Sequence, residues 1–389
     1  MAKFHFEVTK KDSLSRARTG VIFTEHGEIK TPAFVPVGTQ ATVKSLDNSE
    51  LTKLKVQIFF VNTYHMVLRP GLEVIEKMGG LHRFIGLNIP LITDSTGFQI
   101  FSLGNSKRLK IIGNEKEPKL VKINEDGVIF RSHLDGSEHS FTPEKSIAAQ
   151  GILGADIAIS FDECTFYPAS HDYSKAAMER THRWGLRGLV AAQNKLKDYQ
   201  ALYGVVQGGI YEDLRVQSAK YISSLDFPGI AIGGVSVGES KKEMKSVLKW
   251  VIPNLPDEKP RHLLGVGEID DIFDLVAAGV DSFDCVMPTR LGRMGRTLVQ
   301  NSKFKVQSWT IDITKAEYAD DKRPIDEQCE CDVCKNYSRA YLNHLFRAKE
   351  PLAYKLASFH NVYFINNLAG EIRKSIEEGK FSEFRKSYL

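Results

Sequence analysis

The chain has 389 residues, 42% of them hydrophobic and 26% charged, which is typical of a globular protein and excludes a disordered or fibrous class. Lys and Arg total 52 and Asp and Glu total 48, so the net charge of +4 neither requires nor excludes a nucleic-acid partner. No apolar stretch has membrane-spanning length, and the first 16 residues lack an apolar run with a cleavage signal; both absences predict a cytoplasmic protein with no membrane contact.

The first 31 residues contain two short β-like pieces, KFHFEV and GVIFTEHGEI, joined by a Gly-containing turn. Short alternating runs of this kind are typical of antiparallel strands. We therefore expect residues 1–31 to form a small antiparallel sheet that covers one end of the main domain.

From residue 32 onward, short apolar runs alternate with helical segments. Near-continuous apolar strands indicate burial on both faces, as in a parallel sheet. The eight runs are PAFVPVGT (32–39), QIFFVNTYH (57–65), PLITDSTGFQ (90–99), DIAISFDE (156–163), LYGVVQGG (202–209), GIAIGGVS (229–236), HLLGVGE (262–268) and SFDCVMP (282–288).

The segments between these runs carry helix start signals, for example Thr142-Pro143-Glu144 and the serines Ser170 and Ser240. Eight strands alternating with helices predict an α/β fold, a closed TIM (β/α)8 barrel over residues 32–299, with an open doubly wound sheet as the alternative. Two stretches interrupt the pattern and are expected to be insertions. Residues 104–141 contain a Lys-rich segment and a hairpin, and residues 300–350 contain a cysteine cluster. Residues 351–389 are expected to form the helix that closes the barrel.

Polar residues, and glycines with backbone N–H groups to offer, stand where the predicted strands end, and in a barrel these ends meet at one mouth. They are Asn62, His65, Asp94, Ser95, Asp162, Glu163, Gln207, Gly233, Gly234, Gly265, Gly267 and Asp284. Each alone could be a solvated loop residue, and Asp284, followed by a basic turn with Arg290 and Arg293, could simply form a surface salt bridge. The shared position of all of them favours a common cleft.

The chemistry of this set fits a purine such as guanine. Asp162 accepts hydrogen bonds, Gln207 donates and accepts, and glycine N–H groups donate. Phe98 and Leu264 offer apolar faces for stacking, although Phe98 could equally be a core residue. Asp94 and Asp284 then remain for displacement at an anomeric carbon, which requires one nucleophile and one proton donor.

Three of the five cysteines, Cys329, Cys331 and Cys334, lie within one short segment. In a cytosolic chain this spacing indicates metal rather than disulfides. A structural Zn²⁺ site needs a fourth ligand, for which we favour His360 over His344, the alternative being that His360 is a core residue. We expect Cys164 and Cys285 to be packing residues.

Two stretches that flank the cluster, 285–305 and 335–349, contain Lys and Arg but no acidic residue. Such runs usually form solvated basic faces. Because these runs lie beside the predicted strand ends, a surface that binds the phosphates of a nucleic acid is as consistent with them as a solvated face.

In these motifs the chain resembles the bacterial tRNA-guanine transglycosylases. The similar stretches are SRARTG, TPAFVPVGTQ, NTYHMVLRPG, ITDSTGFQIFSL, SHLDGS, DIAISFDEC, GVVQGG, AIGGVSVGE, HLLGVG, FDCVMPTRLGR, C-x-C-x2-C with SRAYLNHLF, and FHN. They follow one another in the family's order along nearly the whole chain. The resemblance implies a TIM barrel with an inserted zinc-binding subdomain, a homodimer, and a pentosyltransferase of the queuosine route.

The implied activity replaces the wobble guanine of certain tRNAs with 7-aminomethyl-7-deazaguanine (preQ1). These are the tRNAs with GUN anticodons, which are specific for aspartate, asparagine, histidine and tyrosine. By position, Asp284 matches the nucleophile and Asp94 the general acid and base. The implied base-binding residues are Asp94, Ser95, Thr96, Gly97, Phe98, Asp162, Gln207, Gly234 and Leu264. The implied tRNA contacts are Gly265, Val266, Gly267, Glu268, Ile269, Asp270, Asp271, Thr289, Arg290, Leu291, Gly292 and Arg293. The implied zinc ligands are Cys329, Cys331, Cys334 and His360.

Some positions depart from the family's pattern. Thr96 stands where the family usually has the first glycine of D-S-G-G, and Leu291 where a small residue is common. Val235, Ser236 and Val237, with Cys164, resemble the pocket that accepts preQ1, and queuine is the alternative incoming base. Two rival functions are a tRNA-binding homologue without catalysis and a barrel glycosidase with two carboxylates.

Overall fold

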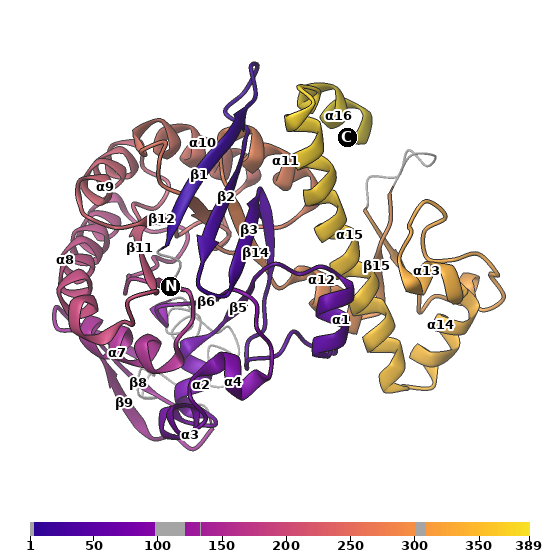
Figure 1. Ribbon diagram of the computed structural model, residues 1–389, viewed down its shortest axis with the longest axis horizontal. Coiled ribbons are helices and arrows are strands. Elements are labelled where there is room, and N and C mark those ends of the chain that lie inside the picture. Colours follow the sequence, from indigo (N-terminus) through magenta and orange to yellow (C-terminus); the bar gives the residue numbers. More distant parts are fainter. Residues whose placement is uncertain (1–3, 98–120, 133, 301–308) are drawn as a thin grey trace.

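Eight parallel strands form the centre of the molecule (Figure 1). The computed structural model describes residues 4–97, 121–132, 134–300 and 309–389. The strands are β4 (Ala33–Pro36), β5 (Phe59–Val61), β6 (Leu91–Thr93), β10 (Ile157–Ile159), β11 (Ala201–Val206), β12 (Gly229–Ile232), β13 (Arg261–Leu263) and β14 (Ser282–Cys285). Six of these strands lie within one of the predicted apolar runs, and the other two, β11 and β13, begin one residue before theirs.

The sheet closes on itself. Its strand order is β4-β14-β13-β12-β11-β10-β6-β5, so every strand neighbours the one next to it in sequence. The two remaining edges meet through a parallel bridge between Val37 and Phe60, and the Gly38 N–H donates to the Phe60 carbonyl at 2.7 Å. The predicted TIM barrel is confirmed, and the open doubly wound sheet is excluded.

The predicted helix starts are also confirmed. Thr142, Ser170 and Ser240 cap α7 (Pro143–Leu153), α8 (His171–Lys195) and α10 (Lys241–Val251), because each hydroxyl accepts a backbone N–H of the first turn. The other barrel-side helices are α1 (Asn48–Lys53), α2 (Thr63–Leu68), α3 (Leu72–Lys77), α4 (Leu81–Ile85), α9 (Glu212–Ser224) and α11 (Ile269–Ala278). Within the described ranges, no helix combines the length and apolar character that crossing a bilayer requires.

After β14 the chain departs from the prediction. The expected basic turn is a short helix, α12 (Met287–Arg293), because Pro288 in its first turn sets a helical φ and nothing after it interrupts the helix. β15 (Arg296–Leu298) then pairs with β16 (Thr310–Asp312), followed by α13 (Asp332–Asn336) and α14 (Arg339–Arg347). Thus a strand within the range expected for the barrel belongs to the sheet of the insertion.

The long helix α15 (Pro351–Glu377) joins the two parts. It contacts α12 and β4 on the barrel side and α13, α14 and β15 on the other, and it lies between them in Figure 1. The chain ends in α16 (Phe381–Tyr388).

The insertion at 104–141 is described only from residue 121 onward. There β7 (Val121–Ile123) and β8 (Val128–Arg131) form the predicted hairpin, and β9 (Glu138–Phe141) adds a third antiparallel strand that was not predicted. Phe130 and Phe141 pack with Trp184 of α8, so this small sheet has its own apolar contact with the barrel.

The N-terminal sheet covers the end of the barrel opposite the mouth. Its strands are β1 (His5–Lys11), β2 (Arg18–Thr24) and β3 (Gly27–Thr31). Phe4 and Phe6 pack against the barrel interior, and the Phe4 ring meets Tyr203 edge-on at 6.0 Å. The predicted sheet is therefore present, and it closes the bottom of the barrel.

A buried ion pair fastens this sheet to the barrel. Arg18 donates to both carboxylate oxygens of Asp281, at 2.8 and 2.6 Å, and the two side chains are 2% and 0% exposed. Asp281 also accepts the Arg261 N–H at 2.7 Å, just before β14 begins. Removing Asp281 would leave the buried Arg18 charge with two backbone carbonyls and, among the described side chains, only the Asp257 carboxylate, 3.8 Å away, as a counter-ion.

We expect Asp281→Ala to lower the free energy of unfolding by about 3–5 kcal/mol, measured by urea denaturation. The matched control is Lys11→Gln, which removes an ion pair with Asp257 whose side chains are 60% and 62% exposed. Exposed pairs contribute roughly 0–1 kcal/mol. Equal losses in the two variants would contradict the anchoring role of the buried pair.

Candidate active site and metal centre

A cavity of about 280 Å³ opens at the carboxyl ends of the barrel strands. It brings together residues from all seven strand ends at which site residues were predicted. The predicted residues that line it are Asn62, Asp94, Ser95, Asp162, Gln207, Gly233, Gly234, Leu264, Gly265, Asp284 and Arg290. Cys164, Val235 and Ser236 line it as well. The three aspartates, far apart in sequence, thus face one cavity.

Asp162 lies after β10 and is held by two side chains. Ser95 Oγ donates to Oδ1 at 2.8 Å, and Gln207 Nε2 donates to Oδ2 at 2.7 Å. Burial raises the pKa of Asp162, although both hydrogen bonds oppose this rise. Gly234 lies beside Gln207 at φ +64°, where a Cβ atom would approach Gln207 Oε1 to 2.3 Å. Only glycine therefore fits next to this amide.

Asp94 follows β6 and accepts hydrogen bonds from the start of α2. The Thr63 N–H donates to Oδ1 at 2.7 Å, and Asn62 Nδ2 donates to Oδ2 at 2.6 Å. Both donors come from the end of the neighbouring strand, β5, so the barrel itself sets the orientation of the Asp94 carboxyl group. Its side chain remains at the cavity wall.

Asp284 lies in β14, one residue before the end of that strand, and also lines the cavity. The Gly265 N–H donates to Oδ1 at 3.0 Å, and His262 Nε2 lies 3.2 Å from the same oxygen. Gly265 adopts φ +80°, a left-handed conformation that glycine tolerates best and that aims its N–H at the carboxylate. His262 was not predicted as a site residue.

Not every predicted base-binding residue lines the cavity. Thr96 is completely buried at φ +83°, an unusual conformation for a β-branched residue, and it is absent from the described lining of the cavity. Its side chain therefore does not narrow this cavity. The Gly97 N–H donates to Ser95 Oγ at 3.2 Å, behind Asp162. Phe98 lies outside the described residues.

The two segments predicted to contact tRNA lie near the cavity but differ in exposure. Gly265, Glu268 and Arg290 are exposed. Gly267 and Gly292 are buried, as are the side chains of Val266, Ile269, Asp271 and Thr289. Arg293 is partly exposed and donates to the Thr289 carbonyl at 2.8 Å.

Arg215 was also missed by sequence reasoning. It is fully buried in α9 and donates to four backbone carbonyls, those of Val206, Gly209, Gly233 and Gly234. Burial lowers its pKa to about 10. Its guanidinium thus ties the ends of β11 and β12 together below the cavity.

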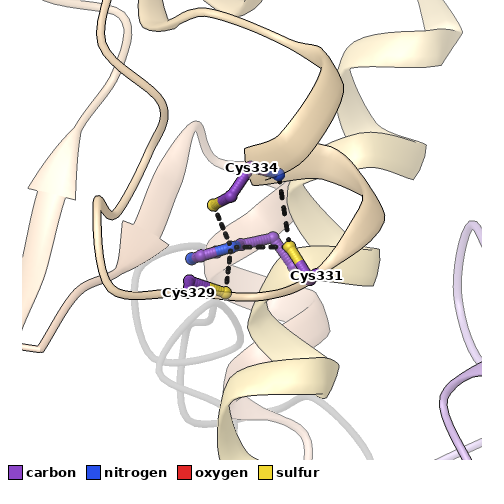
Figure 2. A group of neighbouring side chains, drawn as sticks. Cys329, Cys331 and Cys334 are labelled. Carbon is purple, nitrogen blue, oxygen red and sulfur yellow. Dashed lines mark hydrogen bonds between the residues drawn. The ribbon is translucent and has the colours of Figure 1, made fainter.

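The predicted metal ligands form one cluster. Figure 2 shows the three cysteines converging, and their Sγ atoms lie 3.7, 3.4 and 3.4 Å from His360 Nδ1 for Cys329, Cys331 and Cys334. A tetrahedral zinc site with sulfur and nitrogen ligands has ligand separations of roughly 3.5 Å. His360 Nε2 lies 2.7 Å from the Leu298 carbonyl, a second contact that orients Nδ1 towards the sulfurs. His344 is exposed.

Two other groups of His and acidic side chains do not fit a metal. His26 and His82 flank Asp156, but their rings stack in parallel at 3.5 Å, so their in-plane lone pairs cannot converge on one ion. Glu268, Asp270 and Asp271 surround the ammonium group of Lys241 at 2.7, 2.6 and 3.4 Å. In that group a lysine already occupies the central position.

The basic runs are only partly available to a partner. Lys335 pairs with Glu330 at 2.9 Å, and Arg339 pairs with Asp321 at 3.1 Å. Arg290 and Arg296 remain exposed on and after α12. Lys303 and Lys305 lie outside the described residues. Arg347 and Lys349, at the end of α14 and just beyond it, are exposed too, so of the described basic residues that are exposed in these runs only Arg290 lines the cavity itself.

Comparison with known proteins agrees with this geometry. The profile of the family described as queuine tRNA-ribosyltransferase matches residues 12–389. Queuine tRNA-ribosyltransferases from Caldanaerobacter subterraneus subsp. tengcongensis and Listeria innocua are 49% and 46% identical to the chain over 389 residues, covering 100% of it and 98% and 97% of their own lengths. The protein of that name from Pelotomaculum thermopropionicum is 47% identical over 384 residues, covering 99% of the chain and 97% of its own length. The chain therefore belongs to the queuine tRNA-ribosyltransferase family, whose members are pentosyltransferases.

Proposed function

We propose that this protein exchanges the wobble guanine of GUN-anticodon tRNAs for preQ1, through a covalent bond between Asp284 and the ribose. The observation that carries the proposal is the meeting of Asp94, Asp162 and Asp284 around one cavity of about 280 Å³. A base buried in an anticodon stack must be flipped out to react, and a cavity with polar and apolar walls suits a flipped purine.

The reaction would be a double displacement. One carboxylate oxygen of Asp284 forms a bond to ribose C1′ while the C1′–N9 bond breaks. Guanine leaves with that electron pair and takes a proton from the Asp94 carboxyl group. In the second half, the Asp94 carboxylate takes the N9 proton of the incoming base. This nitrogen then attacks C1′ and releases the Asp284 carboxylate.

Recognition of the base falls to the opposite wall. The Asp162 carboxylate, fixed by Ser95 and Gln207, can accept the adjacent N–H groups of a guanine edge. Leu264 and the apolar part of the lining can contact the purine face, and Arg290 at the rim can meet a phosphate.

The choice of preQ1 over queuine rests on three residues of the cavity wall. Cys164, Val235 and Ser236 line the cavity, and these residues resemble a preQ1 pocket. Queuine carries a bulky ring substituent that needs more room. A non-catalytic homologue is less well supported, because both carboxylates that the chemistry requires face the cavity. The glycosidase alternative gives no role to the exposed Arg290 and Arg296.

The test is to incubate the enzyme with an unmodified GUN tRNA and preQ1, queuine or labelled guanine in turn, then identify the wobble nucleoside by mass spectrometry. We expect guanine and preQ1 to be incorporated and queuine to be incorporated far more slowly. A tRNA whose wobble guanine is replaced by adenine is the control. Queuine incorporation at an equal rate would overturn the choice of base, and binding without incorporation of any base would overturn the catalytic role.

Further proposals concern the rest of the molecule. The separations in the Cys329, Cys331, Cys334 and His360 cluster support a structural Zn²⁺ ion that holds the insertion to α15. We also propose that the chain acts as a homodimer in the cytoplasm. The chain would be built from the units 1–31, 32–299, 300–350 and 351–389, with β15 at the end of the second unit pairing in the sheet of the third. The mass of the protein in solution tests the dimer.

A further inference from the structure

The two oxygens of the Asp284 carboxylate have different hydrogen-bond surroundings. Oδ1 accepts the Gly265 N–H at 3.0 Å and lies 3.2 Å from His262 Nε2. Among the described residues, Oδ2 has no hydrogen-bond partner. The carboxylate is therefore held by one oxygen, and the other is left for a reaction at the cavity.

His262 itself is fixed from three sides. It is 1% exposed on β13, opposite Ser282 in the parallel register with β14, and its Nδ1 lies 2.8 Å from Ser282 Oγ. The Phe60 ring stacks over it at a centroid distance of 6.2 Å. Because an ionised Asp284 only accepts, Nε2 must carry the hydrogen in the neutral ring, and Nδ1 then accepts from the Ser282 hydroxyl.

We propose that His262 is a positioning residue for the nucleophile: with Gly265 it fixes Oδ1 of Asp284, so that Oδ2 is the oxygen that attacks ribose C1′. This inference rests on the proposed function. As the Oδ2–C1′ bond forms and the C1′–N9 bond breaks, Oδ1 becomes the carbonyl oxygen of the ester. It keeps both N–H donors, so no polar group has to reorient during the step.

The test compares two substitutions that separate hydrogen bonding from packing. His262→Phe keeps the ring shape beside Phe60 but removes the donor. His262→Gln loses the ring but can place an amide N–H near the position of Nε2. A positioning role predicts that the Phe variant forms the covalent enzyme–tRNA complex roughly 10–100-fold more slowly in a single turnover. The Gln variant should recover most of that loss.

A packing role predicts the opposite order, with Phe near wild type and Gln impaired, and that result would overturn the proposal. The tRNA dissociation constant, measured by filter binding, should change by less than about 2-fold in both variants, since the bond aligns the nucleophile and adds no tRNA contact. A weakened affinity that accounts for the whole loss of rate would also overturn it.

Ser282→Ala provides a second, milder variant in case His262→Phe does not fold. It removes the hydroxyl that donates to His262 Nδ1 and so selects the tautomer, and we expect roughly a 2–10-fold slower covalent step. An unchanged rate in this variant overturns the proposal. If the wild-type protein itself forms no covalent complex, the proposed function fails; if the wild type forms it and the variants match its rate, only the role of His262 fails.

Discussion

Asp284→Asn is expected to abolish base exchange, lowering the rate of labelled guanine incorporation into tRNA by about 10⁴-fold or more. An amide cannot supply the electron pair that a carboxylate oxygen donates to C1′, so neither half of the double displacement can proceed. The side chain keeps its size, and its carbonyl oxygen can still accept the Gly265 N–H, so the fold and tRNA binding should survive. Denaturing gels should show no enzyme–tRNA complex.

The matched control is Asp172→Asn, which changes the same functional group at the start of α8, where the side chain is fully exposed. This variant should exchange guanine at the wild-type rate and form the denaturation-resistant complex. If Asp284→Asn exchanged guanine as fast as this control, the covalent mechanism would have to be abandoned. A complete loss of tRNA binding would instead assign Asp284 to recognition.

The second large effect concerns the metal centre. We expect Cys331→Ser and His360→Ala each to lose the proposed zinc ion and to loosen the insertion, because Cys331 also caps α13 and His360 lies in α15. For such a small unit the free energy of zinc binding is also the free energy that drives folding, and it is about 10 kcal/mol or more for structural sites. The measured zinc content should fall from one ion per chain to nearly none, and limited proteolysis should cut the chain within residues 309–350.

His344→Ala is the control for the fourth ligand. His344 is exposed on α14, so this variant should keep its zinc and its resistance to proteolysis. Loss of zinc in His344→Ala together with retention in His360→Ala would reverse the ligand assignment. A chelator should reproduce the proteolysis pattern of Cys331→Ser in the wild-type protein, since it removes the same bonds.

The barrel was predictable because its signals are local. Each strand is an apolar run whose composition records burial on both faces, and the helices α7, α8 and α10 each begin at a hydroxyl side chain that accepts an N–H of the first turn. Even the meeting of Asp94, Asp162 and Asp284 followed from one topological rule, that parallel strands in a barrel present their carboxyl ends at the same mouth.

The contacts that orient these aspartates were not predictable in the same way. Arg215 stands in an amphipathic helix like any surface arginine, and only the fold shows that its guanidinium turns inward to four carbonyls. The basic turn after β14 was predicted wrongly because Pro288 is compatible with both a turn and a first helical turn, and packing against α15 selected the helix.

By itself, then, the sequence determined the α/β barrel, the cysteine cluster and the residues at the strand ends, since these depend on hydrophobic pattern and on neighbours a few positions away. Only the tertiary structure decided that His262 stands opposite Ser282 and reaches Asp284, and it placed His360, favoured over His344 from the sequence, beside the cysteines. Both depend on the register of strands and the packing of helices, which are set by contacts between segments far apart in the chain and leave no local trace in composition.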